Sequence, residues 1–197
     1  LLQQPRLDTE SYQVWTERLW QKTIFIQKQR IKYLQLLERL VAEAQKSYIQ
    51  HPITIKLRYQ SKRAMNNDYQ SFLISHLTLQ QDEMRLQRSL FGAHLDDFII
   101  QWHEKHSRLY ASRGQQKLII LLLKVAQMKG LRKKMGESIL LLDDFMTDFD
   151  EKKIKQLLTL FLSLKCPIFY TCAQNGGILR AELSKYSPQE ILLNDIE

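Results

Sequence analysis

The chain has 197 residues, of which 44% are hydrophobic and 25% charged, a composition ordinary for a soluble globular protein of one large domain or two small lobes. Its net charge of +8 favours an anionic partner, with nucleic acid ahead of a membrane surface; a merely soluble basic surface is the alternative. The longest apolar runs are far too short to span a bilayer, and no signal peptide is found. Cys166 and Cys172 read as small core residues rather than a disulfide framework. We therefore expect a cytoplasmic protein without a membrane partner.

Long regular elements fill the first part of the sequence. Apolar residues three, four or seven apart predict a helix from Asp8 or Thr9 to about residue 50, where His51-Pro52 ends it. Strict alternation of apolar and polar residues over 53–59 predicts a half-buried strand. A second helix follows, and its candidate N-caps are Asn66, Asn67 and Asp68.

Strands and helices alternate in the second part of the sequence, after Gly92. We expect, in this order, a strand at 98–102, a helix at 115–129, a strand at 139–142, a helix at 151–164, a strand at 168–172 and a last strand near 191–193. Strands separated by helices of this length are typical of parallel βαβ units. The sequence therefore predicts a mixed α and α/β protein, with a helical lobe and a short strand over 1–90 and half of an α/β domain over 91–197.

The polar segment 111–117 is the first candidate for chemistry. It leads directly into an apolar helix, and its central residues are Ser112, Arg113, Gly114 and Gln115. Backbone N–H groups at a helix start are unpaired, the helix dipole is positive there, and glycine lets a phosphate approach the backbone. The segment is therefore a candidate anion site, with an ordinary N-cap serine before a core helix as the alternative.

The second candidate is a pair of carboxylates, Asp143 and Asp144, that follows the apolar run 139–142. Ligands of open parallel sheets bind at the carboxyl ends of the strands. Adjacent carboxylates are unfavourable unless a cation or hydrogen bonds hold them, so a Mg²⁺ site is the first hypothesis. The alternative is a strand that ends in a polar loop, with an aspartate capping the next helix.

Together these segments resemble the signature and Walker B motifs of ABC-type ATPases. One helix separates Ser112 from Asp143, and Thr147-Asp-Phe-Asp150 and 168–171 follow where such ATPases have their D-loop and switch strand. The wordings SRGQQK, LLDDFMTDFD and, upstream, GAHLDD are similar to those of the RecF family of recombination mediators. The opening LLQQ and the first helix resemble the RecF arm, so the resemblance covers nearly the whole chain. It implies a helical arm lobe plus the C-terminal half of an ABC-type P-loop ATPase α/β domain.

The resemblance also implies a role for each motif residue in a dimer that sandwiches ATP. The signature residues Ser112, Gly114 and Gln115 would contact the γ-phosphate bound by the other subunit. Arg113 would add a charge-assisted contact or, alternatively, pair with an acid of its own lobe. Asp143 would hold Mg²⁺, and Asp144 would be the catalytic residue that positions the attacking water. Thr147 and Asp150 would act across the dimer, and Thr171 takes the switch position. Asp144 stands where most ABC proteins have Glu, which is consistent with a slow, switch-like ATPase.

One element of such an ATPase is not in the sequence. No Gly-x-x-x-x-Gly-Lys-Ser/Thr loop occurs, so we expect this chain to be inactive as an ATPase by itself. The chain opens without an initiator Met, and we expect it to be part of something longer. The resemblance implies an ATP- and DNA-binding part in DNA replication, recombination, repair and the SOS response. Its implied partners are DNA (single-stranded, double-stranded or junctions), an ATP-dependent second copy and other recombination mediators.

Several hypotheses stay open beside this one. A non-catalytic helical interaction module with a degenerate ABC-like segment is the alternative function. Four basic residues of the first helix would bind DNA phosphates, or simply form its solvated face: Lys22, Lys28, Arg30 and Lys32. His94, Asp96 and Asp97 are a candidate metal site by residue type, but the resemblance implies a structural turn there instead. Half of an α/β domain exposes apolar surface, so we also expect self-association.

Overall fold

The computed structural model describes residues 9–48, 53–63, 68–136, 138–144, 148–171, 177–186 and 188–189. The chain forms two compact units. Unit 1 comprises Leu1–Glu38 and Lys56–Gln101, and unit 2 comprises Arg39–Ile55 and Trp102–Glu197. Each unit combines segments that are far apart in the sequence, whereas the predicted domain boundary divides the chain once, at 90/91.

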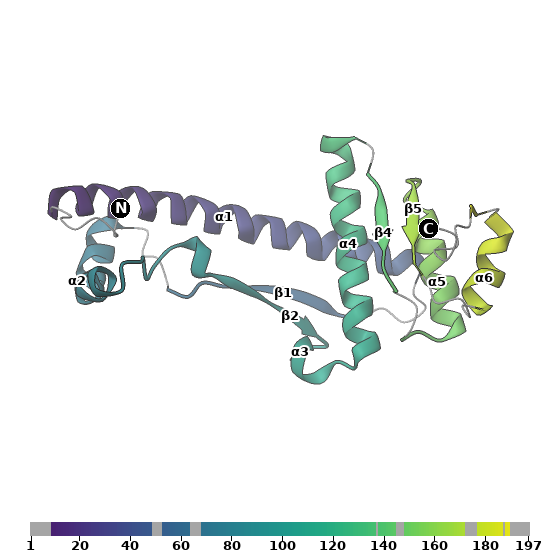
Figure 1. Cartoon of the computed structure of the whole chain (residues 1–197). Helices are drawn as coiled ribbons and strands as arrows, with labels where there is room; N and C mark the ends of the chain where they lie inside the picture. The colour runs from purple at the N-terminus through teal and green to yellow at the C-terminus, as the bar shows by residue number, and fades with distance from the viewer. Residues whose placement is uncertain are drawn as a thin grey trace, which may run out of the picture. The chain divides into compact units, whose positions relative to one another are not determined.

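Two helices supply most of unit 1. The predicted long helix is α1 (Thr9–Tyr48), whose last residues belong to unit 2 (Figure 1). Helix α2 (Tyr69–Leu86) begins at Asp68, whose carboxylate accepts hydrogen bonds from the N–H groups of Gln70 and Ser71. Of the three candidate caps, Asp68 is therefore the one that satisfies unpaired amides of the first turn.

A small sheet contains the strands predicted at 53–59 and 98–102. It consists of β1 (Ile55–Gln60), β2 (Asp97–Trp102) and β3 (Lys105–His106), in the order β1-β2-β3. A two-residue turn at His103 and Glu104 joins β2 to β3, and both residues have positive φ, as tight hairpin turns require. The sequence reading missed β3, because a two-residue strand has no periodicity.

The turn at 92–97 is a structural element of unit 1, as predicted. Ala93–Leu95 form a 3₁₀ turn after Gly92, whose φ is 126°. The carboxylate of Asp96 accepts hydrogen bonds from the Gln27 side chain at 2.8 Å, the Tyr59 hydroxyl at 2.6 Å and the Lys62 N–H at 2.9 Å. Asp96 thus ties the turn to α1 and to the region of β1, which gives it a structural role.

Unit 2 contains the alternating strands and helices of the second part. Short helix α3 (Ser107–Tyr110) precedes α4 (Arg113–Met135), and β4 (Leu140–Leu142), α5 (Glu151–Leu162), β5 (Ile168–Tyr170), α6 (Gly177–Leu183) and a 3₁₀ turn (Ser184–Tyr186) follow. Strands β4 and β5 pair in parallel, with Leu141 opposite Phe169, which confirms the predicted βαβ unit. The predicted strand near 191–193 and Cys172 lie outside the described residues, and Cys166 is a half-buried free thiol.

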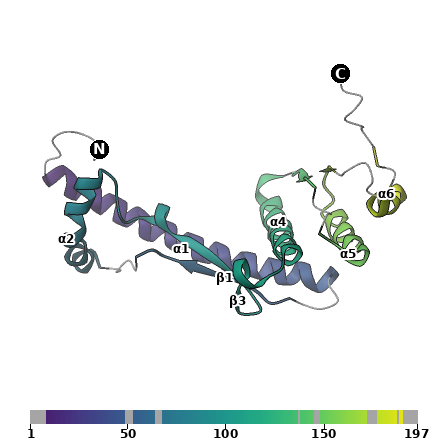
Figure 2. The ribbon, with the colours of Figure 1, turned by 60° about the horizontal axis from the view of Figure 1, so that its bottom comes forward.

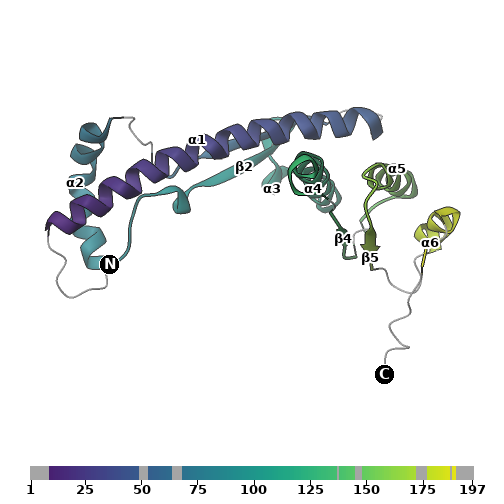
Figure 3. The same ribbon diagram turned by 90° about the horizontal axis from the view of Figure 1, so that it is seen from above.

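Helices α4 and α5 lie on the same side of the β4–β5 sheet (Figures 2 and 3). Leu140 and Leu142 are each 6% exposed, whereas Leu141 is 73% and Phe169 61% exposed. Parallel sheets are normally covered on both faces. The opposite face of this sheet is therefore a bare apolar surface within the described part of unit 2. Among all the residues that the structure describes, no helix is long and apolar enough to cross a membrane.

Candidate functional site

The signature-like segment forms the start of α4. Ser112 is the N-cap residue, and its hydroxyl accepts a hydrogen bond from the Gln115 N–H at 3.3 Å. The Gln115 side chain accepts in return from the Ser112 N–H at 2.8 Å. This reciprocal capping box explains why the helix begins here. The first N–H groups of α4, at Arg113 and Gly114, have no acceptor within the helix. At this exposed N-terminus they are available as donors to an anion.

Gly114 is required by packing within unit 2. A Cβ atom at this position would lie 2.9 Å from the backbone oxygen of Asp148, closer than real side chains come. On its Cβ side, Gly114 thus packs against the segment after β4, and its expected contact with a phosphate stays a prediction. This close approach brings the signature-like turn and the carboxylate-bearing segment together.

The paired carboxylates lie at the carboxyl end of β4, as predicted. Asp143 and Asp144 are both exposed, and the next strand holds them, since the Thr171 N–H donates to the Leu142 carbonyl at 2.9 Å. The Thr171 hydroxyl donates to Asp143 Oδ1 and accepts from the Asp144 N–H at 3.1 Å. Thr171 therefore joins β5 to both carboxylate residues. Asp144 has a φ of 38°, in the left-handed region that few residues other than glycine, asparagine and aspartate adopt.

These two aspartates fit a magnesium ion. Mg²⁺ is commonly bound by one or two carboxylates, with waters and substrate phosphates completing its octahedron, and both side chains are open to solvent. Among the described residues, no group of three or more His, Cys, Asp or Glu side chains gathers as a metal site.

Lys117 was not singled out from the sequence, yet it contacts both sides of the site. Its ammonium group donates to the backbone carbonyl of Asp144 at 2.7 Å and lies 3.2 Å from the Asp148 carboxylate. Lys117 lies one turn beyond Gly114 on α4, so the two share a helix face. Lys117 is the last residue of the segment SRGQQK, but its partners are 27 and 31 residues away, so no pattern in the sequence indicated these contacts.

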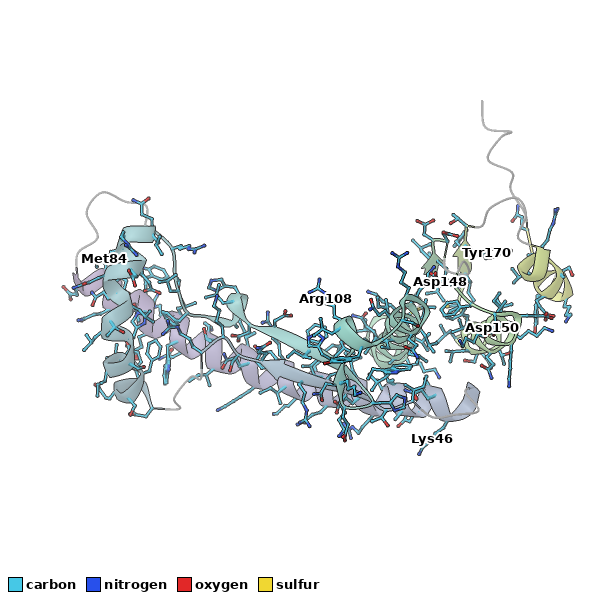
Figure 4. All side chains as sticks on the ribbon, turned by 90° about the horizontal axis from the view of Figure 1, so that it is seen from below. Lys46, Met84, Arg108, Asp148, Asp150 and Tyr170 are labelled. Carbon is cyan, nitrogen blue, oxygen red and sulfur yellow. The ribbon has the colours of Figure 1, made fainter. Side chains whose placement is uncertain are left out.

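The D-loop-like segment ends in a helix cap. Figure 4 shows Asp148 and Asp150, the latter at the start of α5. The Asp150 carboxylate accepts from the Lys153 N–H at 2.8 Å, and this bond holds the pKa of Asp150 below its usual value. Asp150 thus has the capping role that the sequence left open. Thr147 lies outside the described residues.

The four basic residues predicted to bind DNA are all exposed on the part of α1 that belongs to unit 1. Lys22, Lys28 and Lys32 lie among exposed apolar residues, including Phe25, which is 61% exposed. Arg30 differs, because its guanidinium donates to the carbonyl oxygen of Ala93 and so helps to hold the 92–97 turn. A DNA-binding role for these residues stays a prediction.

A hollow of about 560 Å³ lies elsewhere in unit 2. Its lining includes Ser138, Cys166 and Pro167, which precede β4 and β5. It therefore lies at the amino ends of the strands. Ligands of parallel sheets bind at the opposite end, where Asp143 and Asp144 are, so this hollow is not the candidate site.

The sequence is similar to curated proteins named DNA replication and repair protein RecF, although no protein-family model matches it. It is 30% identical over 173 residues to the protein of Syntrophotalea carbinolica, which covers 84% of this chain and 48% of the relative. It is 33% identical over 137 residues to that of Lactobacillus delbrueckii subsp. bulgaricus, covering 66% and 36%. The chain thus spans about half the length, or less, of these relatives.

A solved structure has the same fold. It is described as the recombination mediator protein RecF with ATP in the RecFOR pathway, and the match has a TM-score of 0.65 at 23% identity, covering 87% of this chain and 48% of that one. A second, of RecF with ATPrS, gives 0.62 at 21% identity. These likenesses confirm the predicted fold class, a helical lobe with part of an ABC-type ATPase α/β domain. Sequence and fold together identify the chain as a relative of the RecF DNA replication and repair proteins, corresponding to their C-terminal portion.

Proposed function

We propose that this chain supplies the signature-motif and Walker B part of a RecF-like, ATP-dependent DNA-binding recombination mediator. The observation that carries the proposal is the meeting of two elements within unit 2. The capped N-terminus of α4 packs, through Gly114, against the segment that follows the carboxylates of β4. An anion-binding helix start beside paired carboxylates suits a magnesium-bound phosphate chain.

Each element has its own part in nucleotide binding. Asp143 would hold Mg²⁺, and the ion would neutralise charge on the β- and γ-phosphates. Asp144 would orient the attacking water, since phosphoryl transfer depends on placement more than on covalent chemistry. In an ABC-type dimer, Ser112 and the first N–H groups of α4 would meet the γ-phosphate that the second subunit binds. Arg113, exposed beside them, would add a charged donor.

Thr171, Thr147 and Asp150 complete the proposed site less directly. The Thr171 hydroxyl holds Asp143 and Asp144, so its contribution would be to the shape of the site. One oxygen of the Asp150 carboxylate accepts from the first turn of α5. A contact of Asp150 across a dimer would therefore use the solvent-exposed part of this side chain. Thr147 is proposed from the resemblance alone.

DNA binding is the second part of the proposal. Lys22, Lys28 and Lys32 are exposed cations on one helix, and such residues bind phosphates without regard to sequence. The net charge of +8 supports the same partner. ATP-dependent pairing of two copies, and contacts with other recombination mediators, are proposed from the family resemblance alone.

An ATPase assay tests the proposal. The chain is assayed alone and mixed with the phosphate-loop half of a RecF relative, with and without DNA. We expect activity in the mixture only, and its loss in Asp144→Asn, since asparagine also tolerates the left-handed conformation. Ser112→Arg should abolish it as well, and the matched control is Asp82→Asn, at a residue of α2 in unit 1 whose side chain is 47% exposed. An inactive mixture in which the chain alone still binds DNA or protein would favour the interaction-module alternative.

A further inference from the structure

We propose that Lys117 is a positioning residue, which fixes the backbone of Asp144 and couples it to the signature helix α4. The inference rests on the proposed ATPase function, because it assigns Asp144 the role given there. Lys117 itself would touch neither the nucleotide nor the attacking water. Its contribution would be made through the two residues that it contacts.

Asp144 is held by its backbone on both sides. Its N–H donates to the Thr171 hydroxyl at 3.1 Å, and its carbonyl accepts from the Lys117 ammonium at 2.7 Å. Its φ of 38° is a conformation that an L-residue adopts only when its surroundings favour it. This backbone conformation sets the direction of the Cα–Cβ bond of Asp144. Lys117 and Thr171 therefore together hold the backbone from which the Asp144 carboxylate projects.

Lys117 also connects Asp144 with the start of α4. The same ammonium group lies 3.2 Å from the Asp148 carboxylate, and the Asp148 carbonyl packs against Gly114. One lysine thus joins two points of the segment after β4 to the helix that begins at Ser112. A charged donor with three N–H groups suits a carbonyl and a carboxylate at once.

This connection has a consequence for an ABC-type dimer. The start of α4 would contact the nucleotide of the second subunit, whereas Asp144 would serve the nucleotide of its own subunit. A shift of α4 on contact with a phosphate would be transmitted through Lys117 to the Asp144 carbonyl. Lys117 would thereby couple the two nucleotide sites, which predicts cooperative ATP hydrolysis that depends on this side chain.

The first test needs only this chain. Hydrogen exchange of the Asp144 N–H is compared between the wild type, Lys117→Met and Lys117→Arg, with Lys124→Met, an exposed lysine of the same helix, as control. We expect exchange about fivefold faster in Lys117→Met, because a partly exposed charged hydrogen bond is lost, and little change in the other two variants. Unchanged exchange at the Asp144 N–H of Lys117→Met overturns the proposal. Amides of α5 serve as the folding check, since their exchange stays constant unless unit 2 unfolds.

The second test uses the ATPase mixture described above. In Lys117→Met we expect kcat to fall about tenfold with KM for ATP within twofold, loss of cooperativity, and recovery in Lys117→Arg. A rise in KM at constant kcat would instead make Lys117 a nucleotide-binding residue and refute the positioning role. If the wild-type mixture has no ATPase activity, the proposed function fails, and the exchange measurement still decides whether Lys117 holds Asp144.

Discussion

Replacing Tyr12 with phenylalanine tests how much a buried hydrogen bond stabilises unit 1. Glu83 is 1% exposed; one carboxylate oxygen accepts from the Tyr12 hydroxyl and lies 3.2 Å from His76 Nε2, and the other accepts from the Leu90 N–H at 2.6 Å. The substitution keeps the aromatic ring and removes one donor to a buried charge. Hydrogen bonds to charged groups contribute about 1.5–3 kcal/mol, so we expect a loss of about 2 kcal/mol in the free energy of unfolding.

Urea unfolding followed by tryptophan fluorescence measures this loss. Trp20 reports on unit 1, since its ring lies 5.1 Å from that of Tyr69. With an m-value of about 2 kcal/mol/M, the midpoint should fall by about 1 M. Tyr33→Phe, at a 39% exposed position of the same helix, should change the free energy of unfolding by less than about 0.5 kcal/mol. Equal midpoints for the two variants would refute the reasoning.

The same network predicts a pH dependence. Burial raises the pKa of Glu83, but hydrogen bonds from His76, Tyr12 and the Leu90 N–H outweigh it, so the folded pKa lies below the usual value. Burial and the bond to Glu83 raise the pKa of Tyr12, which therefore stays a donor. A depressed acidic pKa stabilises the fold above the unfolded value, and this is lost as the pH falls through the folded pKa. The difference between wild type and Tyr12→Phe should therefore narrow below about pH 4.

Three further predictions concern single residues. Gly114→Ala should destabilise unit 2 by about 1–3 kcal/mol in urea unfolding, because the new Cβ would lie 2.9 Å from a backbone oxygen. Gly130→Ala is the control, since its Cβ would meet only the Leu40 side chain, at 3.1 Å, and it should be neutral or stabilising. A larger loss of stability in Gly130→Ala than in Gly114→Ala would contradict this. Asp96→Ala should lower the urea midpoint for unfolding of unit 1, since three donors lose their acceptor. An unchanged midpoint would refute the structural role of Asp96. Leu141→Ser on the bare sheet face should reduce self-association in gel filtration, and identical elution of concentrated wild type and variant as monomers would show that this face drives none.

Much of the local structure was determined by the sequence alone. Periodicity predicted α1, α2, α4 and α5, because helices that bury one face carry a 3.6-residue pattern whatever they pack against. Asp68, Ser112 and Asp150 all cap the helices that follow them, a local interaction between a side chain and the next turn. The parallel pairing of β4 and β5 also followed from the strand–helix–strand order.

Contacts between distant residues were decided only by the tertiary structure. The close approach of the Asp148 carbonyl to Gly114 was not predicted from the sequence. The partners of Lys117, and the buried cluster of Tyr12, His76 and Glu83, join segments whose approach no local pattern encodes. The division into two units, each made of separated segments, is of the same kind. Periodicity and capping depend on neighbours along the chain, while these features depend on which surfaces meet when the chain folds, and that is set by packing of the whole molecule.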